Sequence, residues 1–460
     1  MGTYRKESDV LGSVRVPGSA YYGSETQRAV DNFPISGIMV DKGFIHSYVM
    51  LKRAAAIANL ATGKLDGRTG KAIIRACDEL LAGKFLDQFV VDVFQAGAGT
   101  SVNMNVNEVL ANRAIELLGG RRGDYKRVHP NDHVNMSQST NDTYHATIHI
   151  SAHIAIDNEL LPALFGLSSA LHKKAREFSS IVKVGRTHLQ DAVPMTLGQE
   201  FSGYAKSVDE VTAALGAASS KLLVIPLGGT AIGTGLNASK AYASRVVVEL
   251  QKMTKEKFRL APNNFAAQSS QREELAASDA LKEVAVALDK IANDFRILTS
   301  GPRAGIHELI LPEVQPGSSI MPGKINPSMA EMLNMVCFQV MGANAIIERA
   351  ADSGQLELNV FMPVITFNLL FSIRILTNAV GAFTKKCVNG VKANKDAIRE
   401  HLERDLSIVT ALSPYVGYAR AAQLARIAYK KNKNIKQVAM ELKILDGPTL
   451  DKILDPKGQV

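Results

Sequence analysis

Four segments of the chain repeat apolar residues every three to four positions over long stretches. Spacing of this kind predicts long α-helices that pack against one another at shallow angles. Prolines and a capping pattern indicate where these helices begin or bend. The four seams cover residues 197–215, 281–298, 369–387 and, more loosely, 150–171. The predicted starts of three helices are Pro194, the Ser270-Gln271-Arg272-Glu273 capping box and Pro363. Pro162 predicts a kink in the loosest of the four helices. A fifth long helix is expected after Pro327.

Shorter patterns flank these seams. Residues 1 to about 140 mix irregular lead-in structure with helices expected at 45–60, 73–81 and 103–118, and the region after residue 394 reads as short helices. Because 460 residues exceed one compact core, the chain should divide. We predict a mainly α protein with a mixed, mostly helical domain (1–140), a central long-helix bundle (141–393) and a small helical domain (394–460). Long apolar seams also favour homo-oligomerisation.

Composition narrows the class of protein. Hydrophobic residues make up 46% and charged residues 21%, as in an ordinary soluble protein, and no uninterrupted run of about 18 apolar residues predicts a membrane span. The three cysteines have no metal-type spacing and are odd in number, which indicates a reducing, cytoplasmic compartment. The net charge of +9 is spread along the chain, and aromatic residues are 6%, so neither nucleic acid nor a membrane is the expected partner.

One polar loop concentrates groups that can do chemistry. It reads Gly317-Ser318-Ser319-Ile320-Met321-Pro322-Gly323-Lys324-Ile325-Asn326-Pro327. Its glycines permit backbone angles closed to other residues, its serines bring hydroxyl groups and N–H donors, and its lysine suits a carboxylate. Asn326-Pro327 predicts a helix N-cap followed by proline at the first helical position, so the positive end of a helix dipole would face the same place.

Three further polar stretches accompany this loop. They supply Thr100 and Ser101; Ser139, Thr140 and Asn141; and Thr187 and His188. Such an inventory fits removal of a proton beside a carboxylate, because fixed cations and N–H donors stabilise the enediolate that forms. No metal cluster is needed or visible in the sequence. A non-catalytic helical scaffold and a nucleic-acid binder are alternatives, but a scaffold has no use for these loops.

The 317–327 loop resembles the signature of the fumarase/aspartase superfamily, and the similarity runs from about Arg5 to the end of the chain. The resemblance implies a three-domain fold with a central bundle of five long helices, a homotetramer around a shared helical core, and active sites built from three subunits. It also implies a small dicarboxylate substrate and no cofactor or metal. Ser318 would be the general base, and the 317–323 loop would close over the substrate.

The resemblance assigns the remaining site positions as well. It implies Lys324, Asn326 and Thr187 at the α-carboxylate, and Thr100, Ser139, Thr140 and Ser319 at the β-carboxylate. Ser101, next to Thr100, is also expected to bind the substrate. Asn141 and His188 would lie near the leaving group, and Glu331 would orient His188 or Lys324.

Two reactions of the superfamily compete for this chain. The loop Gly97-Ala98-Gly99-Thr100-Ser101 and the threonine at position 140 are similar to aspartases, so the resemblance favours aspartate ammonia-lyase, which deaminates L-aspartate to fumarate in amino-acid metabolism. His129-Pro130-Asn131-Asp132 is similar to fumarases, which makes fumarate hydratase the alternative. His145 departs from the proline that both groups usually carry there.

Overall fold

The computed structural model describes residues 4–460. Most of these residues are helical, which confirms the prediction of a mainly α fold with long helices. The chain forms two compact units, each built from three separate stretches. Unit 1 comprises Met1–Leu161, Ala213–Glu283 and Gln339–Leu376, and unit 2 comprises Pro162–Thr212, Val284–Phe338 and Thr377–Val460. The predicted domain boundaries at residues 140 and 393 stay a prediction.

Long helices appear where the apolar seams predict them. Four of them contribute residues to both units: α7 (Leu197–Ser219), α10 (Arg272–Leu298), α11 (Ser328–Asp352) and α12 (Met362–Lys386). The seam residues Leu288, Phe295 and Phe383 are fully buried, so the 3–4 spacing identified the core-facing side of α10 and α12.

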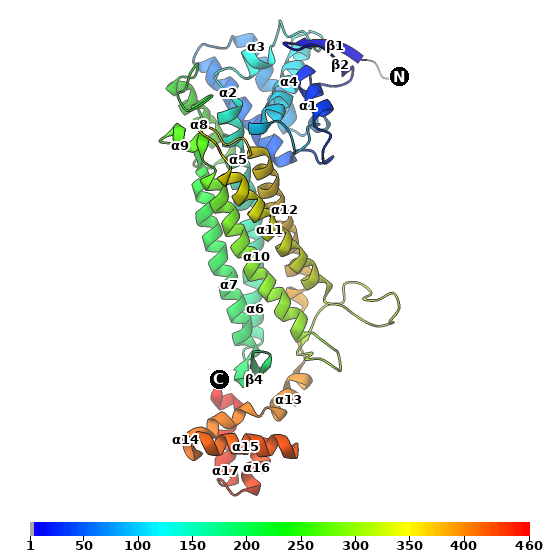
Figure 1. Ribbon diagram of the computed structural model, residues 1–460, viewed down its shortest axis with the longest axis vertical. Helices are drawn as coiled ribbons and strands as arrows, with labels where there is room; N and C mark the ends of the chain where they lie inside the picture. Colours follow the sequence, from blue (N-terminus) through cyan, green and yellow to red (C-terminus); the bar gives the residue numbers. More distant parts are fainter. Residues whose placement is uncertain (1–3) are drawn as a thin grey trace. The chain divides into compact units, whose positions relative to one another are not determined.

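Unit 1 contains most of the remaining N-terminal elements. They are β1 (Tyr4–Asp9), β2 (Gly12–Pro17), α1 (Ser24–Asn32), α2 (Lys42–Ala61), α3 (Gly67–Leu81), α4 (Thr100–Leu117), α5 (Thr140–Ala155), β5 (Val224–Ile225), α8 (Lys240–Thr254), β6 (Arg259–Leu260) and α9 (Asn264–Ser269). In Figure 1, α2 lies beside α3, α5 and α8, with which it packs. Leu51, Tyr242 and Phe258 belong to the apolar core that these helices share.

Two local predictions in the first half of the chain are corrected. The residues expected to be irregular before α1 form the antiparallel hairpin β1–β2, in which Tyr4 pairs with Pro17. The bend expected at Pro162 is a π-helical turn, Ile156–Leu160, just before the proline; because proline lacks an N–H, regular α-helical bonding cannot continue through it.

Unit 2 contains α6 (Leu161–Glu177), apart from its first residue, and the C-terminal elements. The others are β3 (Val182–Thr187), β4 (Gln190–Thr196), β7 (Leu309–Ile310), β8 (Lys392–Ala393), α13 (Lys395–Arg404), α14 (Ser413–Val416), α15 (Tyr418–Lys431), α16 (Ile435–Glu441) and α17 (Gly447–Ile453). Helices α14 to α17, orange to red in Figure 1, gather around a core of their own that includes Leu424, Val438 and Leu450. Pro194, expected to start a helix, lies in β4, because that segment pairs with β3 before α7 begins at Leu197.

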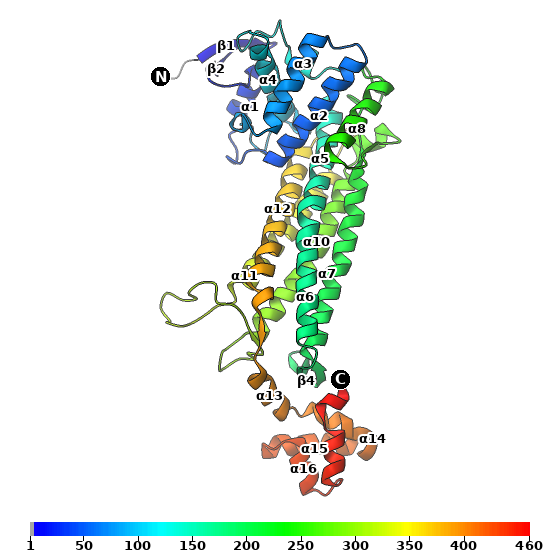
Figure 2. The same ribbon diagram turned by 180° about the vertical axis from the view of Figure 1, so that it is seen from behind.

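Residues 311–327 connect β7 to α11 as an extended loop that projects away from α11 (Figure 2). This is the loop that the sequence singles out for its chemistry. It follows a two-residue strand and precedes the first turn of α11, so both of its ends are anchored in regular structure.

Three helical stretches are long and apolar enough to cross a membrane by length and composition: Thr140–Glu177, Ser328–Asp352 and Met362–Gly390. The search for an uninterrupted apolar run misses them because polar residues are scattered among the apolar ones. In their most apolar windows, 39% to 56% of residues are buried. Large side chains therefore stay exposed on them, including Phe165, Met335 and Phe338.

Candidate active site

Two of the predicted polar stretches meet in unit 1. Thr100 is the first residue of α4, and Thr140 is the first residue of α5. Both line a cavity of about 570 Å³, together with Ser139. The cavity is thus bordered by two helix N-termini, whose unpaired N–H groups favour an anion. Ser101 is buried in α4 and does not line this cavity.

Asn103, which sequence reasoning did not single out, ties α4 to α5. Its Nδ2 donates to Thr140 Oγ1 at 2.8 Å. Its Oδ1 accepts hydrogen bonds from Lys52 Nζ and from Tyr48 Oη, each at 2.8 Å. The amide therefore sets the position of the Thr140 hydroxyl. Its signal in the sequence is its place in the first turn of α4, three residues after Thr100.

Lys52 is a buried cation behind this cavity. It is 1% exposed, and its Nζ donates to the side-chain oxygens of Asn103, Asn135 and Gln138 at 2.8 to 3.0 Å. Burial lowers the pKa of Lys52 to about 7, against the opposing charge of Asp142. The lysine was missed because in the sequence it is one ordinary position within α2.

Asp142 holds the 137–142 stretch in shape. It completes a capping box at the start of α5, where its Oδ1 accepts from Ser139 N at 3.0 Å. Its Oδ2 accepts from the backbone N–H groups of Gly228 and Thr230 at 3.1 and 3.0 Å. Burial raises the pKa of Asp142 to about 6, although these N–H groups favour its charged form. Beside it, Asn141 Nδ2 donates to Ala231 O at 2.8 Å.

The serine predicted to be the base lies in unit 2, where two backbone N–H groups donate to its hydroxyl oxygen. Ser318 Oγ accepts hydrogen bonds from the N–H groups of Ile320 at 3.2 Å and of Met321 at 2.9 Å. Two N–H groups aimed at one hydroxyl oxygen stabilise negative charge on it. Ser319, the next residue, is exposed.

Asn326 braces this loop instead of capping α11. Its Nδ2 donates to Gly317 O at 2.7 Å, and its Oδ1 accepts from Lys324 Nζ at 2.6 Å. Helix α11 begins at Ser328, and Pro327 O accepts from Glu331 N, so the predicted cap at Asn326 is wrong by one residue. Asn326 can reach the Gly317 carbonyl because Gly317 lies directly against the backbone of residues 324–326. A Cβ atom on Gly317 would be 2.1 Å from Lys324 O, so only glycine allows this approach.

Two cavities of unit 2 border the loop. Ser318 and Lys324 line one of about 430 Å³. Lys324, Asn326 and Glu331 line another of about 850 Å³. Lys324 lines both cavities, so the structure brings it close to the other predicted residues Ser318, Asn326 and Glu331.

Thr187 and His188 lie at the tip of the β3–β4 hairpin, which the sequence did not predict. His188 and Leu189 have φ angles of 56° and 58°, as a two-residue hairpin turn of the I′ type requires. Both Thr187 and His188 are exposed, and within residues 4–460 neither side chain makes a hydrogen bond. Orientation of His188 by Glu331 stays a prediction.

Comparison with known proteins identifies the family. The lyase family model matches residues 12–342, and the model of the fumarase C C-terminus matches residues 408–458. The chain is 48% identical to a mitochondrial fumarate hydratase of Saccharomyces cerevisiae, over 99% of this chain and 93% of that protein. It is 45% identical to an aspartate ammonia-lyase of a Bacillus species, over 98% of this chain and 96% of that protein.

Solved structures agree over the full length. A class II fumarase from Schistosoma mansoni superposes with a TM-score of 0.95 at 39% identity, covering 99% of this chain and 98% of that one. A fumarate lyase:delta crystallin from Brucella melitensis, bound to cobalt, gives the same TM-score at 46% identity and covers 99% of both chains.

These relatives contradict the prediction that ammonia is the leaving group. Most of the similar curated proteins are named fumarate hydratase, including those of Thermosynechococcus vestitus and Bacillus subtilis, so the assignment as an aspartate ammonia-lyase is wrong. The error has a chemical reason. Thr100 and Thr140 were weighted most, but the resemblance implies that both contact a carboxylate, which malate and aspartate share. Residues at these positions therefore do not distinguish the hydroxyl group of malate from the amino group of aspartate.

Proposed function

Because the chain belongs to the fumarase/aspartase superfamily, we propose that it is a class II fumarate hydratase, which interconverts L-malate with fumarate and water. Similarity to fumarate hydratases over nearly the whole chain carries this choice of reaction. The substrate is a small dicarboxylate, in keeping with the family.

Ser318 removes the proton from the carbon next to the β-carboxylate. The N–H groups of Ile320 and Met321 support this role, because they stabilise the alkoxide that a serine base requires. The bond between Asn326 and the Gly317 carbonyl holds the loop in the shape that aims these donors.

The polar cavity of unit 1 receives the carboxylate on which charge develops. Thr100, Ser139 and Thr140 are suited to this task, because their hydroxyls and the N–H groups of two helix starts converge there. Lys324 pairs with the other carboxylate, with Thr187 assisting. Asn141 and His188 assist departure of the hydroxyl group as water.

The proposed enzyme is a homotetramer whose active sites combine residues of three subunits. Exposed apolar residues on α11 support this assembly: Met335 is 63% exposed, Phe338 58% and Ile346 45%. Their spacing of three and eight positions places them along one side of the helix, where a second helix would cover them.

A side-by-side assay tests the proposed reaction. Purified protein receives L-malate or L-aspartate, fumarate is followed by ultraviolet absorbance, and ammonia is measured separately. We expect fumarate from malate and no ammonia from aspartate. Ammonia matching fumarate from aspartate, or no product from malate, would contradict the proposal.

The cytoplasmic location is part of the proposal. Relatives include fumarate hydratases of bacteria as well as proteins named mitochondrial from Saccharomyces cerevisiae and Rhizopus oryzae. Fractionation of the source cells, with malate-dependent fumarate formation followed in each fraction, distinguishes the two locations.

A further inference from the structure

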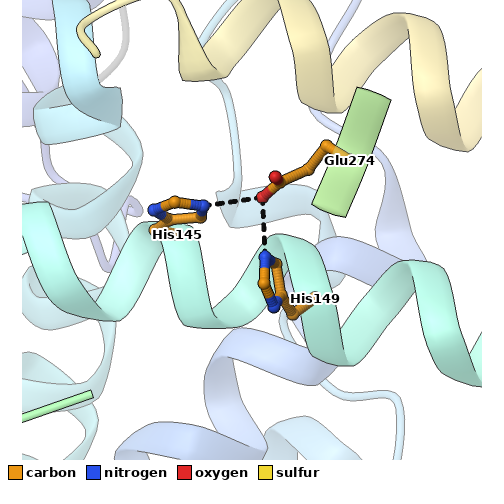
Figure 3. A group of neighbouring side chains, drawn as sticks. All are labelled: His145, His149 and Glu274. Atoms are coloured by element: carbon orange, nitrogen blue, oxygen red, sulfur yellow. Dashed lines mark ion pairs between the residues drawn. The ribbon is translucent and has the colours of Figure 1, made fainter. Parts of the chain in front are cut away.

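Two histidines of α5 and one glutamate of α10 converge in the interior of unit 1 (Figure 3). His145 and His149 are four residues apart, so they share one side of α5. Glu274 lies in the first turn of α10. The three residues are 0%, 2% and 0% exposed, and their ligand-type atoms all lie within 4.8 Å of one another.

Both histidines of this cluster contact the same carboxylate oxygen. The Nε2 atoms of His145 and His149 lie 2.7 and 2.9 Å from the same atom, Glu274 Oε1. Neither contact has the geometry of a hydrogen bond. Both contacts are ion pairs when a ring is protonated. With neutral rings, the buried carboxylate oxygen and the two ring nitrogens lack a compensating positive charge, which a cation among them would supply.

The other ring nitrogen of His149, Nδ1, has a backbone partner. Its Nδ1 lies 2.7 Å from the carbonyl oxygen of Val224. A carbonyl only accepts, so Nδ1 carries a proton, and Nε2 is the ring nitrogen that faces Glu274 and is placed to bind an ion. Metal-binding histidines in proteins are oriented in this way, with one nitrogen donating to a backbone carbonyl and the other free for the ion.

We propose that His145, His149 and Glu274 form a structural site for a divalent transition metal, with zinc as the best fit, that links α5 to α10. Two imidazole nitrogens and one carboxylate oxygen are a donor set typical of zinc, whereas calcium and magnesium prefer oxygen ligands throughout. Tetrahedral zinc with bonds of about 2.0–2.1 Å separates its ligand atoms by about 3.3 Å. The present contacts of 2.7 and 2.9 Å therefore open by about half an ångström when the ion enters.

A buried amide close to Glu274 in the chain is the candidate for a fourth ligand. Gln271 comes just before α10, three residues ahead of Glu274. It is 1% exposed, and neither its Oε1 nor its Nε2 has a hydrogen-bond partner. By contrast, the neighbouring histidine His153 already bonds Ser219 Oγ through its Nδ1 at 2.8 Å and Glu256 through its Nε2 at 3.2 Å. His153 also lies within a second group of metal-type ligands, with Asp157 and Glu256, but both of its ring nitrogens already have hydrogen-bond partners.

Metal content of the full-length protein tests the site directly. Protein is produced in zinc-supplemented medium, passed through gel filtration with a mild chelator, and analysed by elemental mass spectrometry. We expect about one zinc per chain, retained because the site is closed to solvent. Protein produced with cobalt in place of zinc should show the visible absorption bands of tetrahedral Co²⁺, and added Mg²⁺ should not displace either ion.

Three variants locate the ion. His145→Gln and Glu274→Gln each remove a ligand and should lower retained zinc by about tenfold or more. His153→Gln is the matched control and should retain the wild-type amount. The cobalt spectrum of the wild-type protein decides the question even if a variant does not fold.

Two results would overturn the proposal. Wild-type protein with no retained zinc and no cobalt bands would mean that the cluster is an ion pair between protonated histidine and glutamate. Zinc that persists in both ligand variants, or that is lost only from His153→Gln, would place the ion elsewhere.

Discussion

The hydroxyl oxygen of Ser318 lies 2.9 Å from the backbone nitrogen of Met321, which donates a hydrogen bond to it. A second bond comes from the N–H of Ile320 at 3.2 Å. Serine usually donates a proton, and it accepts one only if its alkoxide is stabilised. The two N–H groups would supply that stabilisation to the proposed base, so within the described chain the loop backbone is the group placed to activate Ser318.

Ser318→Ala should remove fumarate formation from malate and leave the fold intact. The side chain is surrounded by loop backbone and not by core, so its loss opens no buried cavity. We expect kcat to fall by about 10²–10⁴-fold, the usual contribution of a general base, with an unchanged thermal midpoint. Ser220→Ala, at an exposed serine that bonds only Gly216 O, is the control and should keep full activity. Activity of Ser318→Ala near the wild-type level would assign the base to another residue.

Lys52 should give the protein a stability that rises with pH. The folded state lowers the pKa of Lys52 to about 7 through burial, whereas an unfolded chain has an ordinary lysine pKa of about 10.4. Between these values the unfolded chain binds the extra proton, so the free energy of unfolding rises with pH by up to about 1.4 kcal/mol per pH unit from this group. Below about pH 7 both states are protonated and the slope vanishes.

Lys52→Met isolates this contribution. Urea denaturation at fixed protein concentration, from pH 6 to pH 9, should show the wild-type midpoint gaining on the variant only above about pH 7. Lys71→Met, at an exposed position of α3, serves as the control and should follow the wild-type curve. Parallel curves for wild type and Lys52→Met would contradict a buried lysine that loses its proton near neutral pH.

The parts of the molecule that repeat a simple pattern were predictable from the sequence. Apolar seams identified α7, α10 and α12, because a helix that buries one side must repeat its apolar residues every three to four positions. The β3–β4 hairpin was not predictable. Its turn uses His188 and Leu189 at positive φ, where glycine and asparagine are the usual signals.

In the candidate site, too, the residues within local sequence patterns were predicted and those joined only by packing were missed. The loops were found because hydroxyl, amide and glycine residues crowd together in the sequence. Lys52 and Asn103 were missed, because they contact Thr140 or its neighbours only through the packing of α2 and α4 against α5. Likewise, Glu274 lies far along the chain from His145, and no local pattern joins them.

Phe338→Glu should separate the proposed tetramer. The side chain is 58% exposed on the apolar side of α11, between Met335 and Ile346. A carboxylate buried there between subunits would lack a partner, which costs more than the lost apolar contact. Light scattering after size exclusion should show smaller species, and activity should fall with assembly because each proposed site needs three subunits. Tyr418→Glu, at an 84% exposed position of α15, should leave the tetramer intact. A tetrameric Phe338→Glu protein would exclude this side of α11 from the interface.

Gly99→Ala should disturb the cavity of unit 1 through the packing of α4 on α5. Gly99 has a φ of +81°, and a Cβ on it would lie 2.1 Å from the Tyr144 ring. Because Tyr144 is fully buried, the start of α4 must move, and Thr100 moves with it. We expect kcat/KM for malate to fall by about tenfold or more, since a displacement of about 1 Å disrupts carboxylate binding.

Two further variants separate the clash from the backbone strain. Gly67→Ala adds a Cβ in the first position of α3, where no atom lies within 4 Å, and should change the free energy of unfolding by less than about 0.5 kcal/mol. Combining Gly99→Ala with Tyr144→Val gives the new methyl group room. Activity should then recover in part. Measured against Tyr144→Val alone, which has its own cost for the lost ring, the double variant should still be less stable by about 1–2 kcal/mol, because alanine at position 99 must adopt a left-handed backbone. Full loss of activity in the double variant would mean that the backbone conformation at Gly99, and not the contact with Tyr144, positions Thr100.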